Sequence, residues 1–186
     1  MLNGNQIELA KKYCIHYHEG QFRKSSNQPY HTHPFAVAEM LERHGYGDPV
    51  TQCIALLHDA VEEVERVEDS EIRMDEIQRK FGYEISNGVC ILSKNEGRMR
   101  NGEQLSHGDY IQRLFRAEEN IKRVKIADVI DNTRDLQALS QAGIEEKIRD
   151  AEEYYIPWGI EIAPIMVKEL AGNITNYRLK LFAQVG

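Results

Sequence analysis

Apolar residues recur every three or four positions through most of the chain, the spacing that puts side chains on one face of an α-helix. The pattern is clear at Ile7, Leu9, Ala10, Tyr13 and Cys14. It predicts helices over residues 5–18, 33–44, 75–80, 85–92, 110–117, 121–139 and 145–170, with a final amphipathic helix over 173–184. No segment alternates apolar and polar residues as a strand does. The fold class expected is therefore all-α.

Polar segments and helix-breaking residues separate these helices. Loops are predicted at 21–32, at the charged stretch 65–71 and at the polar stretch 93–108. Asp48 and Pro49 form a typical start for a third helix, with an N-cap and a first-turn proline. Pro157 and Pro164 are expected to interrupt the helix over 145–170, and Pro164 is expected to kink it.

Length and composition favour one soluble domain. The chain has 186 residues, 41% of them hydrophobic and 28% charged. We therefore expect a single domain over 1–186, with its core in about 7–170. The net charge of −7 and the lack of a basic block predict no nucleic-acid partner. No apolar run nears the roughly 18 residues of a membrane span, so no membrane partner is expected either.

The cysteines and the N-terminus bear on the compartment. Cys14, Cys53 and Cys90 are scattered and form no CxxC pair, which is typical of reduced thiols. The first twelve residues are polar and lack the apolar region of a signal peptide. A cytoplasmic location is expected, and the sequence does not indicate an oligomeric state.

The third helix carries a combination of apolar and chelating residues. The apolar run 53–57 leads directly into His58 and Asp59, and Glu62 and Glu63 follow. A carboxylate carried into a core needs a cation or a hydrogen-bonding partner. Residues four apart share one helix face, so the two glutamates are expected one turn beyond His58 and Asp59.

Two other helices supply matching chemistry. His33 stands at the start of the second helix, and Asp128 lies among apolar residues in the helix over 121–139. Asp128 taken alone is better explained by a structural salt bridge, to Arg123 or Lys125, than by a metal site. Together with His58 and Asp59, however, the set offers two imidazoles and two carboxylates. Such mixed ligands suit Mn²⁺, Fe²⁺ or Zn²⁺ better than Ca²⁺.

The order of these motifs resembles a known family. His33, His58-Asp59 and Asp128 stand as in the HD superfamily of metal-dependent phosphohydrolases. The segments Arg23-Lys24-Ser25, Pro29-Tyr30 and Lys125-Ile-Ala-Asp128 resemble the hydrolase domain of Rel/SpoT-type alarmone enzymes. The resemblance covers about 7–170 and leaves no space for synthetase or regulatory domains. It is therefore closest in kind to stand-alone small alarmone hydrolases of the Mesh1 type. Two departures are Glu63, where the family usually has Asp, and the longer turn 26–28 before Pro29.

The resemblance implies a helical bundle with a buried metal site and a role for each motif. His33, His58, Asp59 and Asp128 would bind one divalent metal, most simply Mn²⁺, with Fe²⁺ or Zn²⁺ as alternatives. Glu62 and Glu63 would be the catalytic carboxylates that take the proton of the attacking water, although Glu63 is equally compatible with a supporting role. The residues implied in substrate binding are Arg23, Lys24, Ser25, Lys94, Asn132 and Arg134.

Three functions remain open on this basis. The first is a 3′-pyrophosphohydrolase of (p)ppGpp-like alarmones, in which water attacks the 3′-diphosphate. The second is an HD-family nucleotidase or phosphatase of another nucleotide, such as NADPH. The third is a non-catalytic nucleotide-binding module. In each case the partner is a small-molecule nucleotide.

Overall fold

The fold is all-α, as the periodicity predicts. The computed structural model describes residues 4–24, 26–62, 67–94, 105–134, 136 and 139–185. Within these residues the regular structure is helical, apart from an isolated antiparallel bridge between Phe22 and Pro29. The first helices along the chain are α1 (Gly4–Tyr17), α2 (Thr32–Arg43), α3 (Pro49–Leu57), α4 (Val67–Phe81) and α5 (Tyr83–Leu92).

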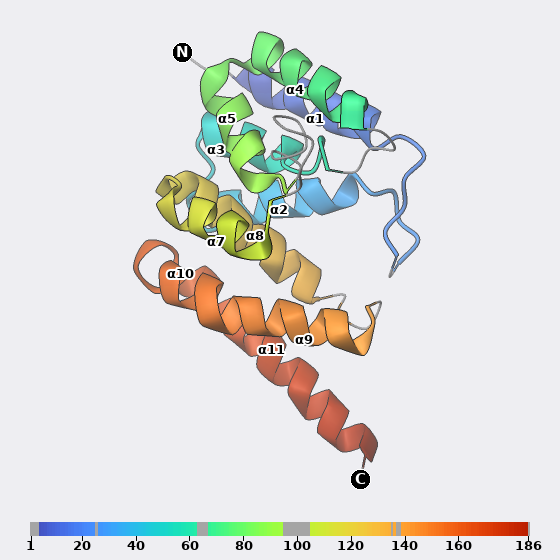
Figure 1. Cartoon of the computed structure of the whole chain (residues 1–186), viewed down its shortest axis with the longest axis vertical. Coiled ribbons are helices and arrows are strands. Elements are labelled where there is room, and N and C mark those ends of the chain that lie inside the picture. Colours follow the sequence, from blue (N-terminus) through green and yellow to red (C-terminus); the bar gives the residue numbers. More distant parts are fainter. Residues whose placement is uncertain are drawn as a thin grey trace.

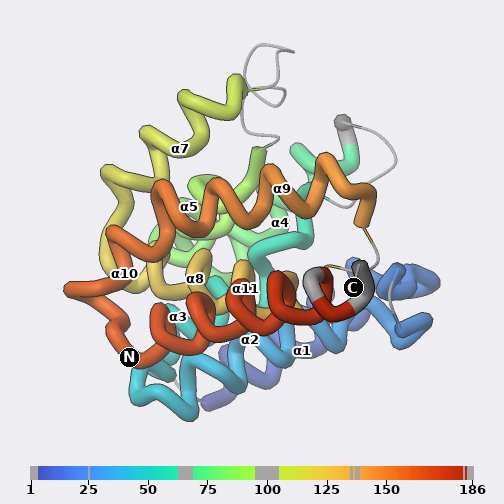
Figure 2. The backbone as a smooth tube through the Cα atoms, turned by 90° about the horizontal axis from the view of Figure 1, so that it is seen from below, coloured from blue at the N-terminus to red at the C-terminus, as the bar shows by residue number. Residues whose placement is uncertain are grey.

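The second half of the chain is helical too. It contains α7 (His107–Arg116), α8 (Glu119–Thr133), α9 (Gln141–Asp150), the π-helical turn η2 (Ala151–Tyr155), α10 (Ile156–Ile162) and α11 (Pro164–Val185). Figure 1 shows α1, α3, α4 and α5 on one side of α8, and α9, α10 and α11 on the other. In Figure 2 α11 lies in front of α8, while in Figure 1 its C-terminal half extends past the other helices.

Helix α8 is the centre of the packing. It contacts α2, α3, α5, α7, α10 and α11. Its buried residues point in every direction around the helix, which is expected of a helix surrounded by others. They are Ile121, Val124, Ile126, Ala127, Asp128, Val129, Ile130, Asp131 and Thr133. Two of them are aspartates, so the centre of the bundle also carries charge.

The end of α3 corrects one expectation. The helix stops at Leu57 and His58 is its C-cap, so His58 to Glu62 form tight turns and not a further helical turn. The backbone N–H groups of Ala60 and Glu62 reach back three residues, to the carbonyls of Leu57 and Asp59. The expectation that Glu62 shares a helix face with His58 was therefore wrong. Glu63 lies outside the described residues.

Helix α4 starts earlier than predicted. The stretch 65–71 was expected to be a charged connection and the helix to start near 75, but α4 begins at Val67. A serine fills a core position in its first turns: Ser70 is fully buried and its hydroxyl donates to the Val61 carbonyl at 2.7 Å. A polar residue on the buried face hid the helical pattern.

Two C-terminal boundaries also differ from the prediction. Helix α8 ends at Thr133 and not at 139. Leu136 was predicted to belong to the apolar face of this helix, but it lies in the segment after α8 and is buried there. Pro164 does not kink a helix but begins α11, which runs unbroken through the expected helix 173–184. Ala163, directly before α11, has a non-helical backbone with φ −152° and ψ 56°, which separates α10 from α11. Its carbonyl accepts a hydrogen bond from the backbone N–H of Val167 in the first turn of α11.

The predicted cap of α3 is confirmed. The Asp48 carboxylate accepts hydrogen bonds from the backbone N–H groups of Val50 and Thr51, both at 3.1 Å. Asp48→Ala should lower the free energy of unfolding by about 0.5–2 kcal/mol, because it leaves these helix-end donors without their side-chain partner. Chemical denaturation measures this loss. Asp48→Asn should retain most of the stability, and an alanine variant as stable as the native protein would show that the cap contributes nothing.

Two of the three cysteines lie in the core. Cys14 and Cys53 are buried free thiols, and burial raises their pKa values to about 12 and about 11. Both are therefore protonated near neutral pH. None of the helices in the described part of the chain combines the length and apolar content needed to cross a membrane.

Candidate metal centre and active-site cavity

Three helices bring the predicted metal ligands together. His33 lies in the first turn of α2, His58 caps α3 and Asp59 follows it, while Asp128 lies in the middle of α8. Helix α3 is buried from Thr51 to Leu57, so its C-terminal end delivers His58 and Asp59 directly into the core. Helix α8 contacts both α2 and α3, which brings Asp128 to the same point.

The ligand atoms converge. His33 Nε2 lies 3.1 Å from Asp128 Oδ1 and 3.5 Å from Asp59 Oδ2. His58 Nε2 lies 3.3 Å from Asp59 Oδ2 and 3.7 Å from Asp128 Oδ1. Ligands about 2.0–2.2 Å from one ion are roughly 2.8–3.6 Å from their neighbours in a tetrahedral or octahedral shell. The separations are therefore on the scale of a metal site.

Both histidines present Nε2 to this point. His58 Nδ1 lies 2.7 Å from the Ala55 carbonyl, which can only accept, so Nδ1 carries the proton. His33 Nδ1 likewise donates to Asp131 Oδ2 at 2.7 Å. His58 Nε2 is buried and has no hydrogen-bond partner in the described structure. A buried acceptor of this kind is what a metal ion satisfies, so the residues fit a divalent metal.

Cationic side chains offset the charge of the buried carboxylates. Burial opposes ionisation of Asp128, but Lys125 and the two imidazoles outweigh it and hold its pKa well below the ordinary value. Burial also disfavours a charged His33, yet hydrogen bonds to Asp128 and Asp131 raise its pKa to about 10. Protonated His33 thus compensates the buried carboxylates. A divalent cation can take over this compensation.

Neighbouring side chains hold the carboxylates in place. Tyr30 Oη donates to Asp59 Oδ2 at 2.9 Å, and Lys125 Nζ donates to Asp128 Oδ2 at 2.8 Å. The Asn132 amide also donates to Asp128. These bonds orient the two carboxylates toward the imidazoles, as supporting groups around metal ligands commonly do.

A cavity of about 540 Å³ opens above the cluster. Its wall carries more basic than acidic side chains, although the chain as a whole is acidic. The basic lining residues are Arg23, Lys24, Lys94, Lys125 and Lys147. Such a wall favours an anionic ligand beside the metal cluster.

Most predicted site residues line this cavity. Glu62 does so, and burial, followed by the charge of Asp59, raises its pKa. The Lys94 backbone N–H donates to the Glu62 carboxylate. Lys24 and Asn132 also line the cavity. Ser25, like Glu63, lies outside the described residues.

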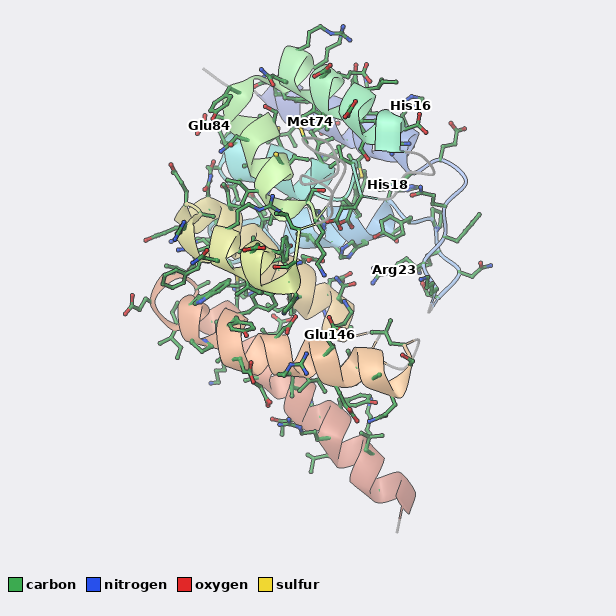
Figure 3. All side chains as sticks on the ribbon, in the orientation of Figure 1. His16, His18, Arg23, Met74, Glu84 and Glu146 are labelled. Carbon is green, nitrogen blue, oxygen red and sulfur yellow. The ribbon has the colours of Figure 1, made fainter. Side chains whose placement is uncertain are left out.

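The two predicted arginines are placed differently. Arg23 lines the cavity, but its Nη1 donates to Asp131 Oδ2 at 2.7 Å. In Figure 3 Arg23 lies between the loop that carries it and the helices. Arg134 is absent from the described lining; it pairs with Glu169 at 2.6 Å and lies 3.5 Å from Asp131 Oδ1.

The sequence did not single out several residues of the site. Asp131, Tyr110 and Lys147 had no predicted role, and Lys125 was considered only as a salt-bridge partner. For Asp131 a signal existed, because residues 128 and 131 are three apart and share a helix face. Tyr110 and Lys147 come from α7 and α9, and nothing in their local sequence points to a shared cavity.

A second group of chelating residues lies elsewhere. His107, Glu146 and Asp150 have side-chain ligand atoms within 4.8 Å of one another. Figure 3 shows Glu146 on α9. His107 and Glu146 are exposed, and His107 Nε2 forms an ion pair with Asp150 at 3.2 Å. The cluster around His33 is the more deeply buried of the two.

Comparisons with known proteins agree with this geometry. The family model of the HD domain matches residues 10–157. The chain therefore belongs to the HD-domain family, whose members bind a divalent metal.

Individual relatives within the HD-domain family are similar over most of this chain. The mouse protein named guanosine-3′,5′-bis(diphosphate) 3′-pyrophosphohydrolase MESH1 is 31% identical over 183 residues, covering 94% of this chain and 89% of the relative. Its human counterpart is 31% identical over 194 residues, covering 97% and 95%. A Streptomyces coelicolor GTP pyrophosphokinase is 34% identical over 158 residues. The match covers 82% of this chain but only 17% of that relative's length.

A solved structure shows the same fold. It is described as a metazoan ortholog of SpoT that hydrolyzes ppGpp, and it matches with a TM-score of 0.62 and 20% identity. The match covers 93% of this chain and 87% of that one.

Proposed function

We propose that this chain is a metal-dependent 3′-pyrophosphohydrolase of (p)ppGpp-like alarmones, folded as a single domain over 1–186. One observation carries the proposal: a His/Asp cluster that fits a divalent metal lies beside a cavity with a basic wall. A nucleotide with several phosphates is a suitable ligand, because its charge is complementary to that wall. The names of the MESH1 relatives point to the same substrate class.

Each group around the cavity has a role in this proposal. His33, His58, Asp59 and Asp128 hold the metal, for which we propose Mn²⁺, with Fe²⁺ and Zn²⁺ as alternatives for this ligand set. A divalent ion there would neutralise phosphate charge. It would also lower the pKa of a water molecule, so that the water loses a proton more readily and becomes a better nucleophile.

Side chains of the protein accept the proton of the attacking water and bind the phosphates. The Glu62 carboxylate, half-buried in the cavity wall, takes the proton of the attacking water. Glu63 is proposed as its helper. Lys24, Lys94, Lys125 and Lys147 face the phosphates, and Asn132 the sugar or phosphate beside the metal.

A comparison of products tests the substrate class. The purified protein is incubated with Mn²⁺ and, separately, ppGpp, ppApp and NADPH, and pyrophosphate and orthophosphate are quantified. The proposal expects pyrophosphate from ppGpp or ppApp. Orthophosphate from NADPH alone would favour the broader phosphatase function. Nucleotide binding without any product would favour a non-catalytic module.

Lys24 gives a test of substrate binding that leaves the metal cluster unchanged. Lys24 is exposed at the cavity, and within the described residues it makes no hydrogen bond or ion pair with the cluster. Lys24→Ala should raise KM for ppGpp about three- to tenfold with little change in kcat, because an exposed cation binds ground and transition states alike. The effect should shrink at high salt, where such contacts are screened.

Steady-state kinetics at two salt concentrations measure this. Lys180→Ala, an exposed lysine near the C-terminal end of α11, is the matched control and should leave KM unchanged. If Lys24→Ala behaves like the control, the loop lysine does not bind the phosphates.

We propose a cytoplasmic location on the basis of the buried, protonated thiols.

A further inference from the structure

The carboxylate of Asp131 joins a surface loop to the metal cluster. Its Oδ2 accepts from His33 Nδ1 and from Arg23 Nη1, both at 2.7 Å. Asp131 is 4% exposed, and the side chain of Arg23 is 13% exposed. Arg23 and Asp131 are 108 positions apart in the chain, so this contact is made only in the folded protein.

The two imidazoles of the cluster are held by different acceptors. His58 donates to a backbone carbonyl, whereas His33 donates to an ionised carboxylate. A carboxylate on the far nitrogen of a ligand histidine fixes the proton on that nitrogen, fixes the ring orientation and makes the ligand more basic. At His33 this leaves Nε2 directed at Asp59 and Asp128.

Asp131 in turn needs a partner. A buried carboxylate is costly unless a cation or several donors compensate it. Arg134 is a weak candidate, because its Nη1 is 3.5 Å from Oδ1 and its side chain is 43% exposed. Arg23 supplies the short, mostly buried ion pair.

Backbone hydrogen bonds within the loop fix the position of Arg23. The Arg23 backbone N–H donates to the Gln28 carbonyl at 2.8 Å, and the Asn27 N–H donates to the Arg23 carbonyl at 3.0 Å. Phe22 and Pro29 form a bridge beside them. Asn27 takes a φ of +56°, which lets the chain turn tightly.

We propose that Asp131 and Arg23 are a positioning pair for the metal ligand His33. Asp131 sets the tautomer and the orientation of the imidazole, and Arg23 keeps the carboxylate in place. The inference rests on the metal centre of the proposed function. It assigns Arg23 to the support of a ligand in addition to the substrate binding that the sequence resemblance implies.

Metal affinity and a histidine proton signal test this pair. Asp131→Leu removes the acceptor, Asp131→Asn keeps an oxygen acceptor without its charge, and Arg23→Gln removes the guanidinium from an exposed loop. Mn²⁺ affinity is measured by calorimetry on each variant. Removing a supporting group of this kind costs about 10–100-fold in affinity. We expect a loss in that range for Asp131→Leu and smaller losses for Asp131→Asn and Arg23→Gln.

The spectroscopic readout uses the Zn²⁺-loaded protein, which is diamagnetic. In the native protein the His33 Nδ1–H should give a sharp, slowly exchanging proton signal. In Asp131→Leu it should be lost to exchange with water, while the His58 Nδ1–H signal remains. Arg23→Lys, which keeps a cation, should restore part of the affinity that Arg23→Gln loses.

A matched control separates this role from general stability. Asp75→Asn makes the same charge change as Asp131→Asn at an exposed aspartate of α4, outside both groups of chelating residues. It should bind Mn²⁺ as the native protein does. Native Mn²⁺ affinity and a retained His33 signal in both Asp131→Leu and Arg23→Gln would overturn the proposal. These readouts do not need hydrolysis, so absence of alarmone hydrolysis with the expected metal losses would contradict only the proposed function.

Discussion

Asp59→Asn should abolish divalent-metal binding and hydrolysis together while the helical fold remains. Asp59 Oδ2 lies 3.5 Å from His33 Nε2 and 3.3 Å from His58 Nε2, at the centre of the cluster. Even groups that only orient a ligand are worth about 10–100-fold in metal affinity. Loss of a ligand carboxylate should therefore reduce Mn²⁺ affinity by more than about 100-fold, with pyrophosphate release falling in parallel.

Calorimetry with Mn²⁺ and circular dichroism check this pair of outcomes. Asp75→Asn is again the control, because it neutralises an aspartate outside both groups of chelating residues. If Asp59→Asn binds Mn²⁺ as tightly as the native protein, the metal does not sit among these four residues.

Glu62→Gln should keep the metal and lose the reaction. The Glu62 carboxylate lines the cavity, and burial raises its pKa, which makes it a better proton acceptor at neutral pH. Glutamine has nearly the same shape and can still accept the Lys94 backbone N–H, but it cannot take a proton. General acid–base catalysis contributes roughly 10²–10⁴ in rate, and kcat should fall by a factor in that range.

The measurement is kcat at saturating ppGpp together with Mn²⁺ affinity. Glu84→Gln, at an exposed glutamate of α5, is the control and should leave both unchanged. A Glu62→Gln variant with near-native kcat would remove Glu62 from the mechanism and leave Glu63 as the candidate base.

Helix positions were predictable wherever the buried face was apolar. The periodicity located α1, α2, α5 and α7 to within a few residues, and the Asp48–Pro49 signal gave the start of α3. It failed where a polar residue fills a core position, as Ser70 does in α4. It also failed where an apolar residue is buried beyond the end of the helix, as Leu136 is after α8.

The four residues of the His/Asp cluster were selected for a different reason. His58 and Asp59 follow an apolar run, and the order of the motifs, through its resemblance to a known family, added His33 and Asp128. The groups that support these residues were harder to predict. Tyr30 contacts Asp59 across 29 positions of the chain, and Asp131 contacts His33 across 98. Only the packing of α2 against α3 and α8 brings these pairs together.

Product release under controlled metal content tests the central claim most directly. The protein is first treated with a chelator and passed over a desalting column. It is then assayed on ppGpp with and without added Mn²⁺, and pyrophosphate and GDP are quantified by ion-exchange chromatography. The proposed function predicts no product from the chelated protein, and equal amounts of pyrophosphate and GDP once Mn²⁺ is restored. Undiminished hydrolysis by the chelated protein, or orthophosphate as the released product, would contradict it.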